Sequence, residues 1–134
     1  MREQLEHTAD VGIEIKSNSF PEALSESCLA LTEIITGGIL VKTSKKLNFK
    51  IHYSDTSHLL IDILNELIVL FDTKNFLPGQ AQITLSNSEA SIFLSGDTYS
   101  PEKYGYGVEV KAISYHNLKV EVGPPSHIIF ILDL

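Results

Sequence analysis

The segment HLLIDILNELIVLFDT, residues 58–73, constrains the fold of this chain more than any other feature. Its apolar residues recur at helical spacing and cover most of the helix circumference, so the helix must be covered on more than one side. Asp55 or Ser57 can cap its N-terminus. Three polar residues share one stripe along it: His58, Asp62 and Glu66. The stripe predicts a solvated seam on a central, buried helix, although this spacing is also compatible with a metal ion.

A second helix is predicted closer to the N-terminus. Ser19-Phe20-Pro21-Glu22 is a capping box with proline in the first turn, and Gly37-Gly38 is a C-terminal stop signal. The buried stripe of this helix consists of Leu24, Cys28, Leu31 and Ile35. Cys28 is therefore predicted to be a core residue and not a catalytic thiol. Because it is the only cysteine, the chain has no internal disulfide and no thiolate-based zinc site, as is typical of a reducing compartment.

Short β-strands are predicted around the two helices. Val11, Ile13 and Ile15 alternate with polar residues and predict a half-buried strand that starts near Asp10. Alternating or apolar segments predict further strands at 45–53, 80–85, 89–94, 108–115, 118–122 and 127–134. The segment 96–107 is predicted to be a polar, glycine-containing loop, and 108–115 and 118–122 are predicted to form a hairpin around His116-Asn117.

The last predicted strand is continuously apolar from Ile128 to Leu132, which predicts burial on both faces and a central position in a sheet. With 134 residues, 43% of them hydrophobic, the chain is long enough to bury one core. The element order β-α-β-α followed by several strands predicts an α+β fold. We expect a single domain over residues 1–134, with two helices packed on a mostly antiparallel or mixed sheet.

The net charge limits the partners of this protein. It is −7, from 17 acidic and 10 basic residues, which disfavours autonomous binding to nucleic acid. The one basic cluster, Lys42, Lys45 and Lys46, is predicted to be a solvated turn. The N-terminus lacks the apolar core of a signal peptide, and no segment approaches the roughly 20 apolar residues of a membrane helix. We therefore expect a soluble, cytoplasmic protein.

The C-terminus combines an apolar strand with negative charge. Asp133 is followed by Leu134 and its free carboxylate, and two anions at the rim of a core repel each other unless they are solvated or share a cation. Asp10 offers a third carboxylate. Three such oxygen ligands would suit Ca²⁺ or Mg²⁺ better than zinc. Spacing alone leaves two alternatives open: solvated chain ends with Asp10 in a polar turn, or a metal site.

No other motif predicts catalysis. His116 is interpreted as a turn histidine, and no serine has the context of a nucleophile elbow. Gly105-Tyr106-Gly107 lacks the third glycine and the strand-to-helix placement of a dinucleotide-binding loop. We therefore predict no catalytic residue. The alternative function is a metal-dependent phosphoesterase or other hydrolase with Asp10 and Asp133 around a bound water, for which the sequence offers no activated nucleophile.

Four blocks together resemble the archease family over essentially the whole chain: HTADVGIEI, HLLIDILNELIVLFDT, VEVKAISYHNLKV and the terminal ILDL. They occur in the order and at the separations of that family. The sequence departs from the family pattern at two places. Tyr104 stands where the family usually has a histidine before the EVKA block, and Ser126-His127 stands where a tryptophan is common.

The resemblance implies a non-catalytic cofactor of the RtcB-type 3′-phosphate RNA ligase that joins tRNA exons. Such a cofactor promotes guanylylation of the ligase and allows multiple turnovers. The resemblance also implies a divalent-cation site, with Ca²⁺ or Mg²⁺ expected and Mn²⁺ an alternative. Its ligands would be Asp10, Asp133 and the main-chain or terminal carboxylate of Leu134, which requires the first and last strands to be neighbours. Further residues expected along the same edge are His7, Lys111 and His116.

Overall fold

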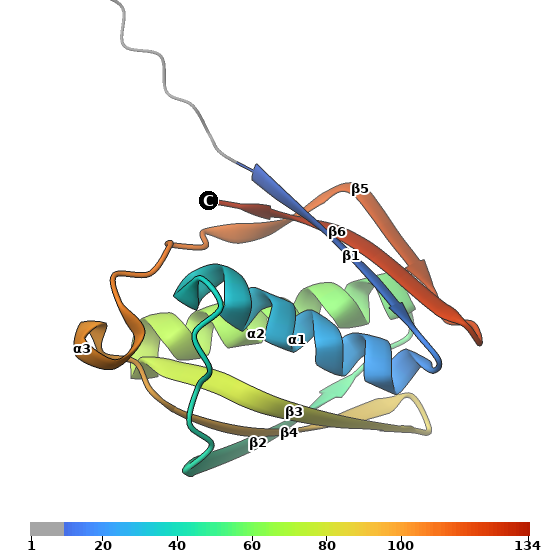
Figure 1. Ribbon diagram of the computed structural model, residues 1–134. Coiled ribbons are helices and arrows are strands. Elements are labelled where there is room, and N and C mark those ends of the chain that lie inside the picture. Colours follow the sequence, from blue (N-terminus) through green and yellow to red (C-terminus); the bar gives the residue numbers. More distant parts are fainter. Residues whose placement is uncertain (1–9) are drawn as a thin grey trace, which may run out of the picture.

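The computed structural model describes residues 10–134, and Figure 1 shows the arrangement of their helices and strands. In chain order these elements are β1 (Asp10–Ser17), α1 (Phe20–Thr36), β2 (Lys45–His52), α2 (Thr56–Lys74), β3 (Phe76–Ser86), β4 (Glu89–Thr98), α3 (Pro101–Tyr104), β5 (Ala112–Glu121) and β6 (Ser126–Asp133). No helix among them is long and apolar enough to span a membrane.

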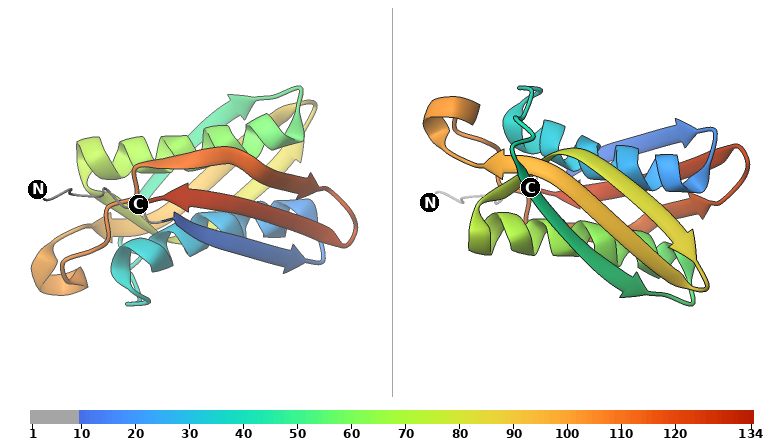
Figure 2. Two further views of the ribbon diagram at one scale, coloured as in Figure 1. Left: turned by 90° about the horizontal axis from the view of Figure 1, so that it is seen from above. Right: turned by 90° about the horizontal axis from the view of Figure 1, so that it is seen from below.

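The strands form two separate three-stranded sheets, in the orders β1-β6-β5 and β2-β4-β3. Every neighbouring pair is antiparallel. The helices α1 and α2 lie side by side between the two sheets, so the core has two interfaces between helix and sheet (Figures 1 and 2). The predicted α+β class is therefore confirmed, with two sheets enclosing the helices.

The central helix α2 has the burial that its sequence predicts. Asp55 caps it, because its Oδ1 accepts hydrogen bonds from the backbone N–H groups of Ser57 at 2.7 Å and His58 at 3.2 Å. Most of its apolar residues are buried, whereas His58 and Asp62 are exposed and Glu66 is half-buried. The polar stripe is a solvated seam. Within residues 10–134 no three His, Cys, Asp or Glu side chains cluster as a metal site would require.

Helix α1 begins and ends where its capping residues predict. The Ser19 hydroxyl accepts a hydrogen bond from the backbone N–H of Glu22, and Gly37 adopts a left-handed conformation with φ 71° at the C-terminal end. Cys28 is fully buried, and this burial raises the pKa of its thiol to about 12. Cys28 is therefore an inert core residue, as predicted.

Strand β6 lies at the centre of its sheet, between β1 and β5, as its apolar sequence predicts. Its inner face is fully buried through Ile128, Phe130 and Leu132. The expected burial of both faces is wrong, because Ile129 and Ile131 on the outer face are only half-buried. The central position explains the apolar sequence, since each outer side chain is flanked by a strand on either side.

The predicted hairpin around His116-Asn117 is wrong. Both flanking segments belong to the single strand β5, and the register changes between the pairs Ser114↔Ile131 and Lys119↔Ile129. Residues 115–118 therefore bulge, and Asn117 has a φ of 57°. The turn-forming residues make a bulge because the segments on both sides pair with β6 and not with each other. The hairpin turn lies instead at residues 122–125, between β5 and β6.

Two other segments differ from the predictions. Residues 96–98 of the predicted loop continue β4, and Pro101–Tyr104 form one helical turn, α3. Strand β3 begins at Phe76 and passes through Pro78 and Gly79 by a change of register. A Cβ atom on Gly79 would lie 2.6 Å from the carbonyl oxygen of Val41, so only glycine fits this bulge.

Candidate functional site

Asp10 and Asp133 lie directly opposite each other on neighbouring strands. Antiparallel pairing of β1 with β6 makes them Cα partners at the end of the ladder. Side chains alternate along both strands, and the next pair, Val11 and Leu132, points into the core. The two carboxylates therefore project on the same outer face of the sheet, where Asp10 is exposed and Asp133 is half-buried.

Strand β5 completes this corner of the sheet. Ala112 pairs with Asp133, and the backbone N–H of Lys111 donates a hydrogen bond to the carbonyl oxygen of Asp133 at 2.8 Å. Leu134 follows directly. The structure thus brings together Asp10, Asp133, Leu134 and the backbone of Lys111, and we define these four residues as the acidic corner.

His116, another expected edge residue, is not part of this corner. His116 lies in the bulge of β5 opposite Phe130, three residues along β6 from Asp133. It is exposed, and its backbone N–H donates to the Ser114 hydroxyl. His7 lies outside the residues that the structure describes.

The electrostatics of the acidic corner are unfavourable without a counterion or solvent. Like charges directly opposite on neighbouring strands destabilise a sheet. The salt bridges found within residues 10–134 use other carboxylates, those of Glu14, Glu89, Asp97 and Glu121. Asp10 and Asp133 thus have no cationic partner in the described chain.

The donor set of the acidic corner fits a hard divalent cation. It offers two side-chain carboxylates and, one residue away, the main-chain oxygen of Leu134, all of them oxygen donors. Since no third His, Cys, Asp or Glu side chain joins them within residues 10–134, a further protein ligand would come from Leu134. Water molecules complete such sites when a cation is bound at a surface.

The chain matches the Archease protein family over residues 3–134, nearly its whole length. This protein belongs to the archease family.

The curated archeases that it resembles cover nearly the full chain. It is 31% identical to the protein archease of Pyrococcus furiosus over 123 residues, which are 89% of this chain and 87% of that protein. It is also 31% identical to the archease of Pyrococcus abyssi over 126 residues, 91% of this chain and 89% of the relative.

Solved structures agree with this fold. The crystal structure of an archease from Thermotoga maritima, described as a possible chaperone, superposes with a TM-score of 0.72 at 28% identity and covers 100% of this chain and 98% of that one. The solution structure of protein 1598 from Methanobacterium thermoautotrophicum has a TM-score of 0.73 over 97% of this chain and 96% of its own. At 24% identity, the second comparison shows the fold alone.

A second polar cluster surrounds Tyr104, where a departure from the family pattern is expected. The Tyr104 hydroxyl, on a residue that is 3% exposed, donates a 2.6 Å hydrogen bond to Oδ2 of Asp97 and accepts one from the backbone N–H of Lys42 at 3.1 Å. The Lys103 Nζ lies 3.4 Å from the same Asp97 oxygen. Tyr104 is therefore a structural residue that joins β4, α3 and the loop after α1.

The pKa values of Asp97 and Tyr104 shift in opposite directions. Hydrogen bonds from the Tyr104 hydroxyl and from the Thr98 backbone hold the pKa of the Asp97 carboxyl below its usual value. Burial, reinforced by the Asp97 carboxylate, raises the pKa of Tyr104. Both shifts favour a neutral tyrosine that donates to a charged carboxylate. The sequence offered only a weak signal for this cluster, the Ser100-Pro101 helix start.

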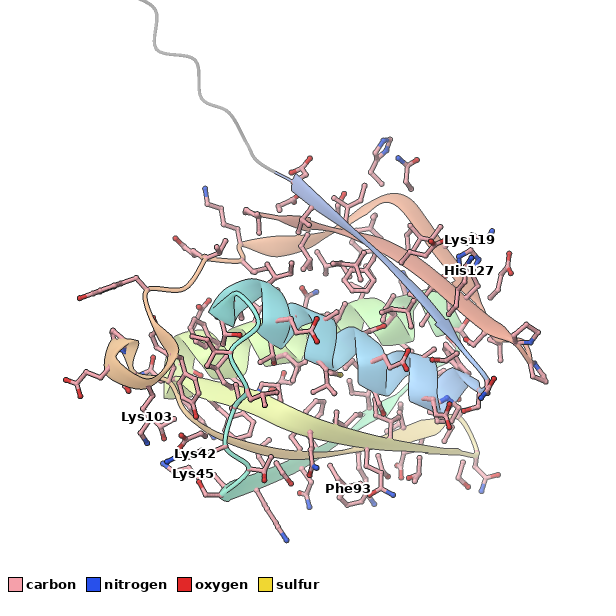
Figure 3. The ribbon with its side chains drawn as sticks, viewed as in Figure 1. Lys42, Lys45, Phe93, Lys103, Lys119 and His127 are labelled. Carbon is pink, nitrogen blue, oxygen red and sulfur yellow. The ribbon has the colours of Figure 1, made fainter. Side chains whose placement is uncertain are left out.

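The basic cluster after α1 is solvent-exposed, as predicted, but it is not a single turn, because Lys45 and Lys46 begin β2 and only Lys42 lies in the loop. Lys42, Lys45 and Lys46 are all exposed. Figure 3 shows Lys42, Lys45 and Lys103 together at the end of the lower sheet, where the Lys45 ammonium group donates to the Thr98 hydroxyl. Their positive charge thus lies at one end of the sheet β2-β4-β3, whereas the acidic corner belongs to the other sheet.

A shallow hollow of about 570 Å³ lies away from the acidic corner. It is on the outer face of β2-β4-β3, lined by Asn48, Gln82 and Phe93 among others. The acidic corner itself is a convergence of strand ends on an outer sheet face. Such a geometry suits the presentation of charge to another molecule better than the enclosure of a substrate.

Proposed function

We propose that this archease is a non-catalytic cofactor of an RtcB-type 3′-phosphate RNA ligase in the cytoplasm. It would act in tRNA splicing by promoting guanylylation of the ligase and allowing multiple turnovers. The observation that carries this proposal is the pairing of Asp10 with Asp133 beside the chain terminus. Membership in the archease family supports it. Three residues of the acidic corner, Asp10, Asp133 and Leu134, are those that the family resemblance implies as ligands.

Asp10, Asp133 and the Leu134 terminus would hold a divalent cation, either Ca²⁺ or Mg²⁺, with Mn²⁺ as the alternative. When bound, the cation supplies a positive centre that phosphate or carboxylate oxygens of a partner can approach. The three residues hold their oxygens at one corner because the antiparallel register places both carboxylates on one face. The Lys111 backbone orients the last strand from the other side.

The net charge of −7 supports a protein partner over direct RNA binding. A ligase that binds RNA needs a basic surface, so an acidic activator has complementary charge and is steered toward it. In this proposal the activator contacts the ligase and not the RNA. Tight RNA binding by the isolated protein would contradict it.

The deciding experiment is ligation of a 3′-phosphate RNA by the ligase of the same organism, at limiting enzyme. Single-turnover and multiple-turnover reactions are compared with no activator, with wild type and with Asp10→Ala. Asp62→Ala is the matched control, because Asp62 is an exposed carboxylate on α2 outside the acidic corner. We expect stimulation of multiple turnover by wild type and Asp62→Ala only. The proposal fails if wild type gives no stimulation of an active ligase, or if Asp10→Ala stimulates equally.

The alternative function, a metal-dependent hydrolase, requires turnover without a partner. Purified protein would have to hydrolyse phosphoesters with Ca²⁺, Mg²⁺ or Mn²⁺ present, and Asp10→Asn would have to abolish that activity. We expect no turnover, because the acidic corner is an exposed strand end and not an enclosed pocket.

A further inference from the structure

Strand β4, the central strand of the sheet β2-β4-β3, carries a phenylalanine on its solvent-facing side. Phe93 is 46% exposed, and Figure 3 shows it on the side of the sheet that faces away from the helices. Because side chains alternate along a strand, its neighbours Ile92 and Leu94 point into the core, where both are buried. The sheet therefore presents one aromatic ring to solvent near the middle of its outer face.

The residues around Phe93 are polar. Asn48 on β2 and Gln82 on β3 pair directly with Phe93, one on each side, and both are exposed. The other outer-face residues along the part of the ladder from Lys46 to His52 are Lys46, Lys50, His52, Gln80, Thr84, Ser86, Glu89, Ser91 and Ser95. Phe93 is therefore the only apolar side chain on this part of the described outer face.

The outer face is hollowed around Phe93. The hollow of about 570 Å³ is lined by Phe93, Asn48, Gln82 and Lys46 among others, and two smaller hollows of about 340 and 80 Å³ also have Phe93 in their walls. Residues directly opposite on neighbouring strands have Cβ atoms about 5 Å apart, so the two carboxamides flank the aromatic ring. This arrangement is suited to a flat polar ring that stacks on Phe93 and exchanges hydrogen bonds at its edges.

A nucleobase has both properties. Every base has a π-face that stacks on aromatic side chains. Asparagine and glutamine carry a donor and an acceptor on one carboxamide, which is the pair of groups that adenine requires at its edge. Asn48 and Gln82 supply two such carboxamides beside one ring.

Positive charge gathers at one end of this face. Lys46 lies two residues from Asn48 on the same strand and the same face, about 7 Å along it. It takes part in none of the salt bridges found within residues 10–134. Three further lysines lie together at this end of the sheet in Figure 3: Lys42, Lys45 and Lys103. A phosphate group attached to a base on Phe93 could therefore reach Lys46 across one ribose.

The opposite end of the face lacks free positive charge. The Lys50 Nζ lies 3.6 Å from one carboxylate oxygen of Glu89, and the His52 Nε2 lies 3.1 Å from the other. An RNA chain that crosses the face would need basic side chains on both sides of Phe93, because each phosphate carries a charge. Positive charge at one end only favours a single nucleotide as the ligand.

We propose that the outer face of β2-β4-β3 binds a purine mononucleotide. The base stacks on Phe93, the carboxamides of Asn48 and Gln82 hydrogen-bond to its edges, and the phosphate lies at Lys46. This site is separate from the acidic corner, which belongs to the other sheet. The proposal goes beyond the proposed function and does not depend on it.

The test is an NMR titration of the whole protein with AMP, with a chelator present so that no cation at the acidic corner contributes. AMP should shift the ring signals of Phe93 and the side-chain amide signals of Asn48 and Gln82. Phe93→Ala should bind AMP at least about fivefold more weakly, because it removes the ring on which the base stacks. Phe93→Tyr should retain binding. Tyr106→Ala, which removes an aromatic ring that is 94% exposed on a loop, is the matched control and should bind AMP as wild type does.

The phosphate contact is tested with adenosine and with Lys46→Gln. Wild type should bind adenosine more weakly than AMP. Lys46→Gln should lower the affinity for AMP toward that for adenosine, without changing the affinity for adenosine. A variant that merely unfolded would lose both ligands. Lys50→Gln is the matched control, because Lys50 already pairs with Glu89, and it should bind AMP as wild type does.

Three outcomes would overturn the proposal. Absent AMP binding, or equal binding by wild type and Phe93→Ala, would show that no base stacks on this face. Equal affinity for ribose 5-phosphate and AMP would leave a site for anions that does not recognise the base. Much tighter binding of a short adenylate oligonucleotide than of AMP would make an RNA chain the ligand. Only this last result would also contradict the proposed function, whereas the first two leave it standing.

Discussion

The Tyr104 hydroxyl donates a 2.6 Å hydrogen bond to the Oδ2 of Asp97, a carboxylate that is only 4% exposed. The same hydroxyl accepts the backbone N–H of Lys42, so one side chain connects three segments of the chain. This contact holds α3 and the loop after α1 in position. The contribution of this contact to stability can be tested independently of any partner.

Replacing Tyr104 by Phe should lower the free energy of unfolding. The change removes the hydroxyl that both Asp97 and the Lys42 backbone contact, and loss of a partner by a buried polar group costs about 1–3 kcal/mol. Urea unfolding checks this expectation. Tyr106→Phe, which removes the hydroxyl of an exposed tyrosine two residues away, is the matched control and should leave stability unchanged. Equal stability of Tyr104→Phe and wild type would show that the hydrogen bond is dispensable.

The same variant should raise the pKa of Asp97 toward its usual value of 3.8, because the Tyr104 hydrogen bond is the largest cause of its depression. A folded-state pKa below the unfolded value stabilises the protein above pH 3.8, and this contribution is lost as pH falls through the folded pKa. Wild type should thus resist acid to lower pH than Tyr104→Phe. NMR titration of the Asp97 carboxyl checks the direction. Asp55 serves as internal reference, because backbone N–H groups depress its pKa independently of Tyr104.

Phe130→Ala should destabilise the fold far more than Phe93→Ala. Phe130 is fully buried on the inner face of the central strand β6, and removal of such a ring costs about 3–5 kcal/mol. Phe93 is 46% exposed on the outer face of β4, so its removal should cost less than about 1 kcal/mol. Chemical denaturation of both variants measures the difference. Similar losses would contradict the assignment of the outer face of β2-β4-β3 to solvent.

Asp10→Asn should separate electrostatic repulsion from cation binding at the acidic corner. Without divalent cations the variant should melt at or above the temperature of wild type, because one of two facing carboxylates is neutral. At a Ca²⁺ concentration 100 times the dissociation constant, wild type should gain about 2.7 kcal/mol and the variant much less. Thermal unfolding with Ca²⁺ or with chelator measures both effects. An equal gain in Asp10→Asn would exclude the Asp10 carboxylate as a ligand, and Asp62→Asn is the control for a general salt effect.

Extending the chain beyond Leu134 by a short Gly-Ser segment should weaken cation binding. The extension moves the terminal carboxylate away from the acidic corner and leaves Asp10 and Asp133 unchanged. Calorimetric titration with Ca²⁺ should then show a reduced affinity, with the same melting temperature in the presence of chelator. Undiminished affinity would mean that the Leu134 carboxylate is not a ligand.

Local signals in the sequence determined much of this architecture. The Ser19 and Asp55 caps, the Gly37 stop and the apolar stripe that contains Cys28 each depend on residues within a few positions of one another. Capping and burial patterns at such short range act through the backbone of the element itself, so they can be read before the fold is known. The apolar sequence of β6 likewise predicted its central place, although its outer face is only half-buried.

The tertiary structure alone decided three features: the pairing of Asp10 with Asp133, the bulge at His116-Asn117 and the burial of Tyr104. Asp10 and Asp133 stand at opposite ends of the described chain, and their pairing follows from the register of β1 on β6. His116-Asn117 has the residues of a turn, yet pairing of both flanking segments with β6 converts it into a bulge. Tyr104 lies in a polar, glycine-containing segment and becomes buried only because Asp97 and Lys42 meet there. These features could not be predicted from local sequence because they depend on long-range pairing. The free energy of such pairing depends on which strands become neighbours and not on the conformational preference of each segment.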